Sequence, residues 1–355
     1  MVLKCALIGN DIPVVEGDRQ GDESLILKGE HMFKQKLGRA GIPALILGLV
    51  GLGIAPLAGA SPGTALNPGQ ANKAASKLVA TVKENVALHK TLPSWILKKG
   101  FILVGAQMEN APDDFFSGTS TKAVGFEVNL ARAIGKVLGV NIRYLQIPVW
   151  SSIVPAVQTG RVDMSMTAMN DRVAREQLIN FVDYLVDGVG ILVKAGNPQN
   201  ITGPSGLCGK NVTDTSGTTQ EIYLNSLNAA GGLCASNPIT EVIASSTAQE
   251  LANLATGRAD AVLNDNITDS YDQQTMANAV YAVPYAPIMS GPYGIGVPKD
   301  DVRLLNAVQK SLTILMAGGS SSVYRKILTD WNVASVAIPA AVINGCAKPI
   351  YAKGC

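Results

Sequence analysis

The sequence predicts an α/β protein with two similar lobes. Short apolar runs alternate with amphipathic segments, a pattern typical of parallel strands joined by helical crossovers. The motif TGRxD occurs at residues 159–163 and 256–260, each time between a predicted helix and a predicted strand. This repeat indicates an internal duplication. With 355 residues, 47% of them hydrophobic, the chain can bury the cores of two domains.

The strand predictions follow the short apolar runs. They cover Phe101–Ala106, Ile142–Ile147, Asp163–Ala168, Gly190–Lys194, Asn211–Thr213, Thr240–Ala244, Ala259–Asn264, Val280–Val283 and Tyr293–Val297. Helices fill the gaps between them. One apolar helical face starts at Leu130 and ends at Gly139. A capping box from Thr247 to Glu250 predicts another helix, and a third runs from Asp301 to Met316.

The segment Met32–Ala60 predicts export. Three basic residues precede an uncharged apolar stretch, and small residues form a cleavage site before Ser61. The stretch could instead serve as a membrane anchor, but its glycines and two prolines favour cleavage. Residues 1–31 carry charges of both signs, unlike the start of an export signal, so we expect translation to begin at Met32. The mature protein is then soluble and periplasmic or extracellular.

The cysteines agree with export to an oxidising compartment. Once Cys5 is set aside, four remain, and we expect the local disulfides Cys208–Cys234 and Cys346–Cys355. The alternative is four unpaired cysteines that act as small apolar residues.

Charge and composition exclude several functions. Lys and Arg number 29 against 27 for Asp and Glu, and no basic run is interleaved with aromatics, so we expect no nucleic-acid partner. The chain has two histidines, His31 and His89, and both precede the part that looks globular. Because no metal-binding or nucleotide-binding motif is present either, we expect no metal and no cofactor.

The candidate ligand site lies after the repeated strands. In parallel α/β sheets, ligands bind beyond the carboxyl ends of the strands. Here those ends deliver Ala168–Asp171 in the first unit and Asn264–Asn266 in the second. If the lobes face each other, the two loops meet across a cleft. We therefore expect a ligand that both lobes enclose.

The residues around these strand ends fit a zwitterionic amino acid. Arg175 could bind the carboxylate, unless it is an ordinary solvated charge. Thr218 and Thr219 open a helix whose free N–H groups form an anion site, although a plain helix cap has the same pattern. Asp265 could bind the ammonium group or cap its loop. Trp150 could lie against the ligand or belong to the core.

Residues 99–331 resemble the family 3 extracellular solute-binding proteins of amino-acid ABC transporters. The resemblance rests on the segments GFEVNLARAIGKVLGV, WSSIVPAVQTGRVD, AMNDRVAREQLINFVDYL, SGTTQEIYL, ATGRADAVLNDNITDSY and SGPYGIGVPKDD. It implies the type II periplasmic-binding-protein fold, with two mixed, mostly parallel sheets joined by hinge strands near Ile191–Lys194 and Ser290–Ile295. It also implies an α-amino acid as ligand, a membrane permease as partner and no catalysis, and we expect a monomer.

The resemblance also implies a division of the chain. We expect an upstream segment and signal peptide (1–60), a helical N-terminal extension (61–97), a first lobe (98–192 and 293–335), a second lobe (193–292) and a C-terminal tail (336–355).

By position, Arg175, Thr218, Thr219, Asp265 and Trp150 match the family's ligand-binding residues. Asn170 replaces the usual Ser or Thr at its position.

The side-chain pocket matches no single subtype of the family. Its candidates are Gln107, Glu109, Asn110 and Phe115, with Arg172 as a second cation that either lies near the carboxylate or faces solvent. Relatives that bind basic side chains tend to carry an acid in place of Gln107. Glu109 or Asp114 in the same loop keeps one alternative open, a dehydratase similar to cyclohexadienyl or arogenate dehydratase. Loop carboxylates are usually solvated, which favours the binding protein.

Overall fold

The computed structural model describes residues 14–15, 66–118, 120–348 and 355. The predicted signal peptide, its cleavage site and the proposed start at Met32 lie outside these residues. The helices are α1 (Pro68–Thr81), α2 (Val86–His89), α3 (Ser94–Lys99), α4 (Phe126–Leu138), α5 (Ile153–Gln158), α6 (Val173–Glu176), α7 (Thr219–Asn228), α8 (Thr247–Thr256), α9 (Asn266–Thr275), α10 (Val302–Met316) and α11 (Val323–Asp330).

Eleven strands form one mixed sheet in the described part of the chain, and three short strands form a second sheet. The large sheet contains β1 (Val14–Val15), β2 (Phe101–Ala106), β6 (Asn141–Gln146), β7 (Met164–Ser165), β8 (Asn180–Lys194), β9 (Asn211–Thr215), β10 (Thr240–Ala244), β11 (Ala261–Asp265), β12 (Val280–Ala282), β13 (Ile288–Val297) and β14 (Ala337–Ile343). The small sheet contains β3 (Glu109–Asn110), β4 (Asp114–Phe116) and β5 (Ala123–Val124).

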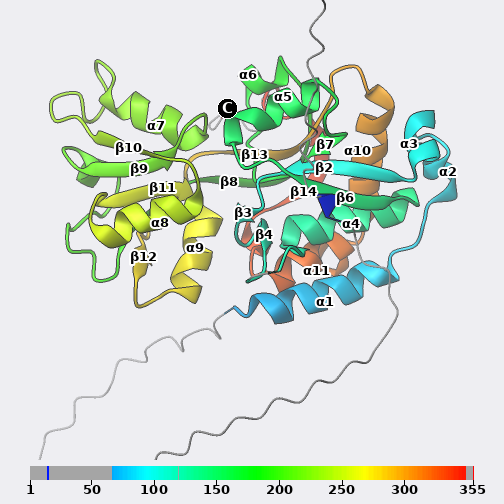
Figure 1. Ribbon diagram of the computed structural model, residues 1–355, viewed down its shortest axis with the longest axis horizontal. Coiled ribbons are helices and arrows are strands. Elements are labelled where there is room, and N and C mark those ends of the chain that lie inside the picture. The colour runs from blue at the N-terminus through cyan, green and yellow to red at the C-terminus, as the bar shows by residue number, and fades with distance from the viewer. Residues whose placement is uncertain (1–13, 16–65, 119, 349–354) are drawn as a thin grey trace, which may run out of the picture. The chain divides into compact units, whose positions relative to one another are not determined.

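The large sheet has two ends with parallel strands. At one end β2 pairs in parallel with β6 and β7, and at the other β9 pairs in parallel with β10 and β11. Helices α7, α8 and α9 accompany the second end, whereas α4, α10 and α11 accompany the first (Figure 1). Each end has its own apolar core, one around Phe126 and Trp331 and one around Leu224 and Leu263. These two ends are the halves of the molecule.

Strands β8 and β13 connect the halves. The first part of β8 pairs with β13 and β14, and its last part pairs with β11 and β12. The two sheets expected from the sequence are therefore hydrogen-bonded into one. Pairing with β11 starts at Val189, before the expected hinge at Ile191–Lys194, and the register of β13 on β8 shifts between Ile288 and Gly291.

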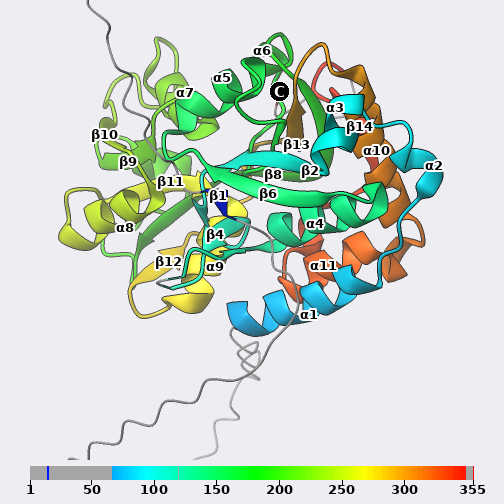
Figure 2. The ribbon, with the colours of Figure 1, turned by 45° about the vertical axis from the view of Figure 1, so that its right-hand side comes forward.

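Both terminal segments of the described chain are part of the fold. Helix α1 packs on α4 and α11 below the sheet (Figure 2), and it buries Ala71, Ala75 and Val79. The Nδ1 atom of His89 lies 2.8 Å from the Leu138 carbonyl oxygen, so this histidine belongs to the packed part of the chain. The predicted C-terminal tail contains β14, which pairs with β8.

Local capping explains where the helices start and stop. Helix α4 ends at Gly139, whose φ of 65° is left-handed, as predicted. The N-cap of α8 is Ser246, one residue before the predicted Thr247, because the Ser246 side chain accepts the Gln249 N–H. Both expected disulfides, Cys208–Cys234 and Cys346–Cys355, are present.

Candidate functional site

A narrow cavity lies where the carboxyl ends of strands from both halves meet. Its walls are formed by Gln107, Asn110, Trp150, Ala168, Asn170, Thr215, Thr218, Thr219, Gln220, Thr247, Glu250, Leu263, Asn264 and Asp265. It has about 30 Å³ of room for water, which is space for about two molecules. The structure thus brings eight of the twelve predicted ligand residues to one cavity.

Four hydrogen bonds close this cavity by joining the two halves. Asn170 Oδ1 accepts from the Thr219 hydroxyl at 2.9 Å, and Asn110 Oδ1 accepts from the Thr247 hydroxyl at 3.0 Å. The Gly217 carbonyl accepts from Trp150 Nε1 at 3.2 Å and from Arg175 Nη2 at 3.1 Å. The described conformation is therefore a closed one.

Arg175 lies beside the cavity rather than in its wall. Its Nη1 donates to the Asn170 carbonyl at 2.9 Å, and its guanidinium carbon lies 5.9 Å from the centre of the Trp150 ring. Burial, together with the nearby charge of Arg172, lowers the pKa of Arg175 to about 10. Arg172 thus lies close enough for its charge to act on this position.

Asp265 lies on the opposite side, at the end of β11. Its Oδ1 accepts from Gln220 Nε2 at 2.8 Å. Burial raises the pKa of Asp265 to about 6, while Tyr293, Gln220 and the charge of Arg175 act in the opposite direction. Among the residues that the structure describes, neither Asp265 nor Arg175 has an ion-pair partner within 4.0 Å. The site therefore holds a cation and an anion that do not neutralise each other directly.

The N-terminus of α7 supplies the donors predicted for an anion. Thr218 is its N-cap, and the Thr218 side chain accepts from the Glu221 N–H. However, Glu221 Oε2 already accepts the Gly217 N–H at 2.7 Å, so part of this donor set is used within the turn. Gly217 has a left-handed φ of 81°, which turns its carbonyl toward Trp150 and Arg175.

Three predicted pocket residues do not line the cavity. Phe115 packs 6.1 Å from both Tyr271 and Trp331, ring centre to ring centre, and therefore belongs to the core. Glu109 lies in β3. Arg172 occupies the N-cap position of α6, where its side chain makes no capping hydrogen bond.

Asp114, the acid of the dehydratase alternative, is fully buried away from the cavity. Its carboxylate accepts from the Met108 N–H at 2.9 Å and from the Thr167 hydroxyl. A carboxyl group enclosed in this way does not reach a substrate in the cavity.

The sequence prediction missed Thr215, Gln220, Thr247, Glu250 and Leu263 in the cavity wall. Thr247 and Glu250 were recognised only as parts of a helix cap. The signal that could have found them is their place after β10, because β10 is parallel to β9 and its carboxyl end faces the same cleft.

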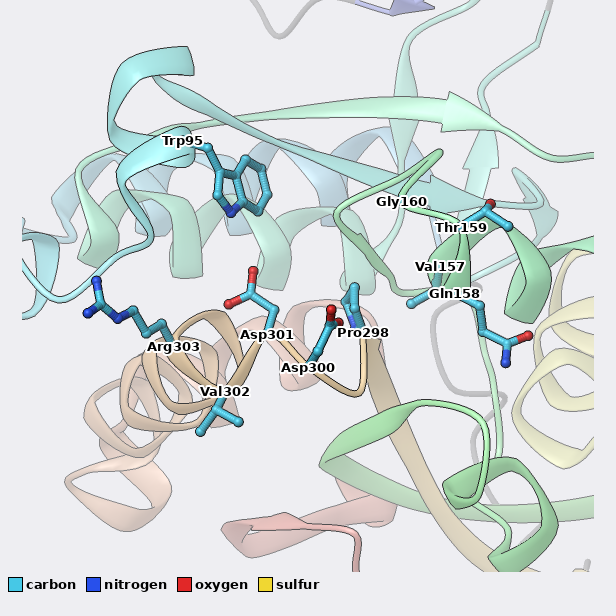
Figure 3. A pocket seen from close by; sticks show the side chains of 10 residues that line it. All are labelled: Trp95, Val157, Gln158, Thr159, Gly160, Pro298, Asp300, Asp301, Val302 and Arg303. Carbon is cyan, nitrogen blue, oxygen red and sulfur yellow. The ribbon is translucent and has the colours of Figure 1, made fainter.

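A wider hollow of about 570 Å³ lies between α3, the end of α5 and the start of α10. Trp95, Asp300, Asp301 and Arg303 surround it (Figure 3), and no residue predicted for the ligand lines it. No cluster of His, Cys, Asp and Glu suited to a metal occurs among the described residues. Within the same residues, every helix is too short or too polar to cross a membrane.

Two α/β halves that close over a cavity at their strand ends define a two-lobed binding protein. The solved structure of an ancestral arginine-binding protein bound to arginine matches 65% of this chain and 98% of its own, with a TM-score of 0.57 and 29% identity. The structure of an ancestral amino-acid-binding protein described as a precursor of cyclohexadienyl dehydratase matches with a TM-score of 0.58 and 28% identity, covering 67% of this chain and 98% of its own.

The family model of bacterial extracellular solute-binding proteins, family 3, matches residues 102–333, and the chain belongs to this family. The lysine/arginine/ornithine-binding periplasmic protein of Escherichia coli is 27% identical over 70% of this chain and 95% of its own. The arginine-binding protein ArgT of Corynebacterium glutamicum is 24% identical over 71% of this chain and 81% of its own. The fold is that of the type II periplasmic binding proteins, and the protein binds a solute rather than catalysing a reaction.

Proposed function

We propose that the protein captures an α-amino acid between its two lobes and delivers it to the permease of an ABC importer. The observation that carries this proposal is the pair of unneutralised charges, Arg175 and Asp265, one from each half of a closed cleft. A zwitterion bears both complementary charges. Relatives named for binding arginine, lysine, ornithine and cystine support an amino acid as the ligand.

Each end of the amino acid has its own set of contacts. Arg175 and the hydroxyls of Thr218 and Thr219 bind the carboxylate, and Asp265 accepts from the ammonium group. Trp150 covers the carbon skeleton. The carboxylate replaces the Gly217 carbonyl at Arg175, because a charged acceptor forms the stronger hydrogen bond.

Binding requires the lobes to open and close. The cavity has room for only about two water molecules, so a ligand enters after the bonds between the halves break. We assign lobe 1 to residues 98–192 and 293–335 and lobe 2 to residues 193–292, with β8 and β13 as the hinge. A bound amino acid bridges both lobes and shifts the population toward the closed form.

The experiment is a thermal-shift screen of the purified protein against the standard amino acids, followed by calorimetry. We expect at least one amino acid to bind with roughly micromolar affinity, which charge-assisted bonds at both ends supply. If no amino acid raises the melting temperature, the proposal is wrong.

Export and the monomeric state are parts of the same proposal. We expect N-terminal sequencing of the protein from its host to begin at Ser61, and light scattering to give the mass of one chain. A precursor that contains residues 1–31 would contradict the proposed start at Met32.

A further inference from the structure

Glu250 is a buried carboxylate in the cavity wall that backbone recognition does not use. It lies in the first turn of α8 and is 3% exposed. Arg175, the α7 threonines and Asp265 already account for both charged ends of an amino acid. Glu250 is therefore available to the third part of such a ligand, its side chain.

The hydrogen-bond partners of Glu250 are neutral. Oε1 accepts from the Thr215 hydroxyl at 2.7 Å, and Oε2 accepts from Asn264 Nδ2 at 3.2 Å. Among the described residues, no Lys, Arg or His forms an ion pair with it. Each carboxylate oxygen accepts more than one hydrogen bond, so both have lone pairs left. A buried acid without a counter-charge keeps its proton because the charged form is costly, and a cation in the cavity would favour the ionised form.

The groups around Glu250 are also acidic. Burial, together with Asp214, Asp265 and Asp272, raises the pKa of Glu250 to about 8, although the Thr215 hydrogen bond acts in the opposite direction. These acids come from β9, β11 and α9. The charge of Arg175 acts on Asp265, but among the described residues no Lys, Arg or His forms an ion pair with any of these acids, so the local potential favours a positive group.

The facing wall from the other half is neutral. Gln107 and Asn110 lie there, with Asn110 Nδ2 3.3 Å from Gln107 Oε1. Asn110 Oδ1 accepts from Thr247, at the start of the helix that carries Glu250. A ligand side chain that enters between Asn110 and Thr247 therefore meets amide oxygens on one side and the Glu250 carboxylate on the other.

We propose that Glu250 is a specificity-determining residue that selects amino acids whose side chain ends in an ammonium or guanidinium group. This inference rests on the proposed function and names the ligand class of the same site. Free Glu250 carries a proton at pH 7 because its pKa is about 8. The bound cation favours the ionised carboxylate, so that proton passes to the buffer.

The test is calorimetry of the full chain with arginine, lysine and glutamine, comparing the wild type with Glu250→Gln. We expect the variant to bind arginine or lysine at least about thirtyfold more weakly, the usual loss for a charge-assisted bond, and glutamine within about threefold of wild type. Glu84→Gln, which alters an exposed carboxylate outside the cavity, is the matched control and should leave all three affinities unchanged.

Proton release provides a readout that needs no variant. Titrations of the wild type in buffers of different ionisation enthalpy should show release of most of one proton per cation bound at pH 7. They should also show tighter binding at pH 8.5, because a smaller fraction of Glu250 is then protonated and has to lose its proton. The same titrations with glutamine should release no proton, and if Glu250→Gln does not fold, this contrast between the cationic ligands and glutamine decides the question.

The outcomes separate the two proposals. Binding of neutral amino acids in preference to arginine and lysine, or cation binding that is independent of Glu250 and releases no proton, overturns the inference but leaves the proposed function standing. The proposed function itself fails if the wild type binds no amino acid at all.

Discussion

Replacing Arg175 by alanine is expected to weaken amino-acid binding at least about thirtyfold. In the closed structure its guanidinium donates to two neutral carbonyl oxygens, those of Asn170 and Gly217. A ligand carboxylate at this position makes charge-assisted bonds, each about 1 kcal/mol stronger than a bond to a neutral carbonyl. Two such bonds amount to about 2 kcal/mol, which is about thirtyfold in the dissociation constant.

Isothermal titration with the best ligand from the screen measures this loss. Arg161→Ala is the matched control, because Arg161 is an exposed arginine in the same half of the molecule. Its affinity should stay within about twofold of wild type, and both variants should keep the wild-type circular dichroism. A folded Arg175→Ala protein with unchanged affinity would refute the role of Arg175 and, with it, the zwitterion argument.

Three further predictions concern stability. Replacing Cys208 and Cys234 by serine should lower the free energy of unfolding, measured by urea titration, by about 3 kcal/mol. Without the disulfide, the unfolded chain is no longer restricted by a loop that joins two residues 26 positions apart. An unchanged urea midpoint would contradict this. Burial raises the pKa of Asp183 to about 9, so its proton favours the folded state below the unfolded pKa near 4, and this stability is lost as the pH rises toward 9. The melting temperature should fall from pH 5 to pH 9, and Asp183→Asn should flatten that fall; equal slopes would exclude Asp183 as a cause. Gly125→Ala should prevent folding, because the new Cβ would lie 1.9 Å from a backbone carbonyl oxygen at a φ of 135°, whereas Gly160→Ala, with no atom within 4 Å, should cost only about 1–2 kcal/mol; comparable melting temperatures would disprove the steric explanation.

Burial of the carboxylates could not be predicted from the sequence. In the sequence, nothing distinguishes Asp171, Asp183 and Glu176 from ordinary acidic residues of a loop, a strand and a helix. In the structure, each of the three is almost fully buried. Their carboxylates accept the consecutive N–H groups of residues 345–347, at 3.0 to 3.3 Å. This arrangement depends on β14 lying against β8, a pairing of segments about 150 residues apart that no local pattern indicates. The predicted C-terminal tail therefore packs as part of the fold through residues 337–347.

In the candidate site, too, some residues were predictable from the sequence and others were not. Asn170 and Asp265 were predictable because they follow the predicted strands of a recognisable repeat, and strand ends of parallel sheets meet at one edge. Phe115 was predicted for the pocket because it lies in the loop after β2, but the direction of its side chain depends on the turn between β3 and β4. It packs against Tyr271 and Trp331 instead.

By itself the sequence determined the α/β class, the bounds of β2 and β10, the end of α4 at Gly139 and the two disulfides. These features depend on residue order and on contacts between near neighbours. Only the tertiary structure decided that the two sheets are continuous through β8, that the cleft is closed and that Glu250 lies in its wall. Those features depend on side-chain directions and on contacts between distant segments, which the packing of the whole chain sets.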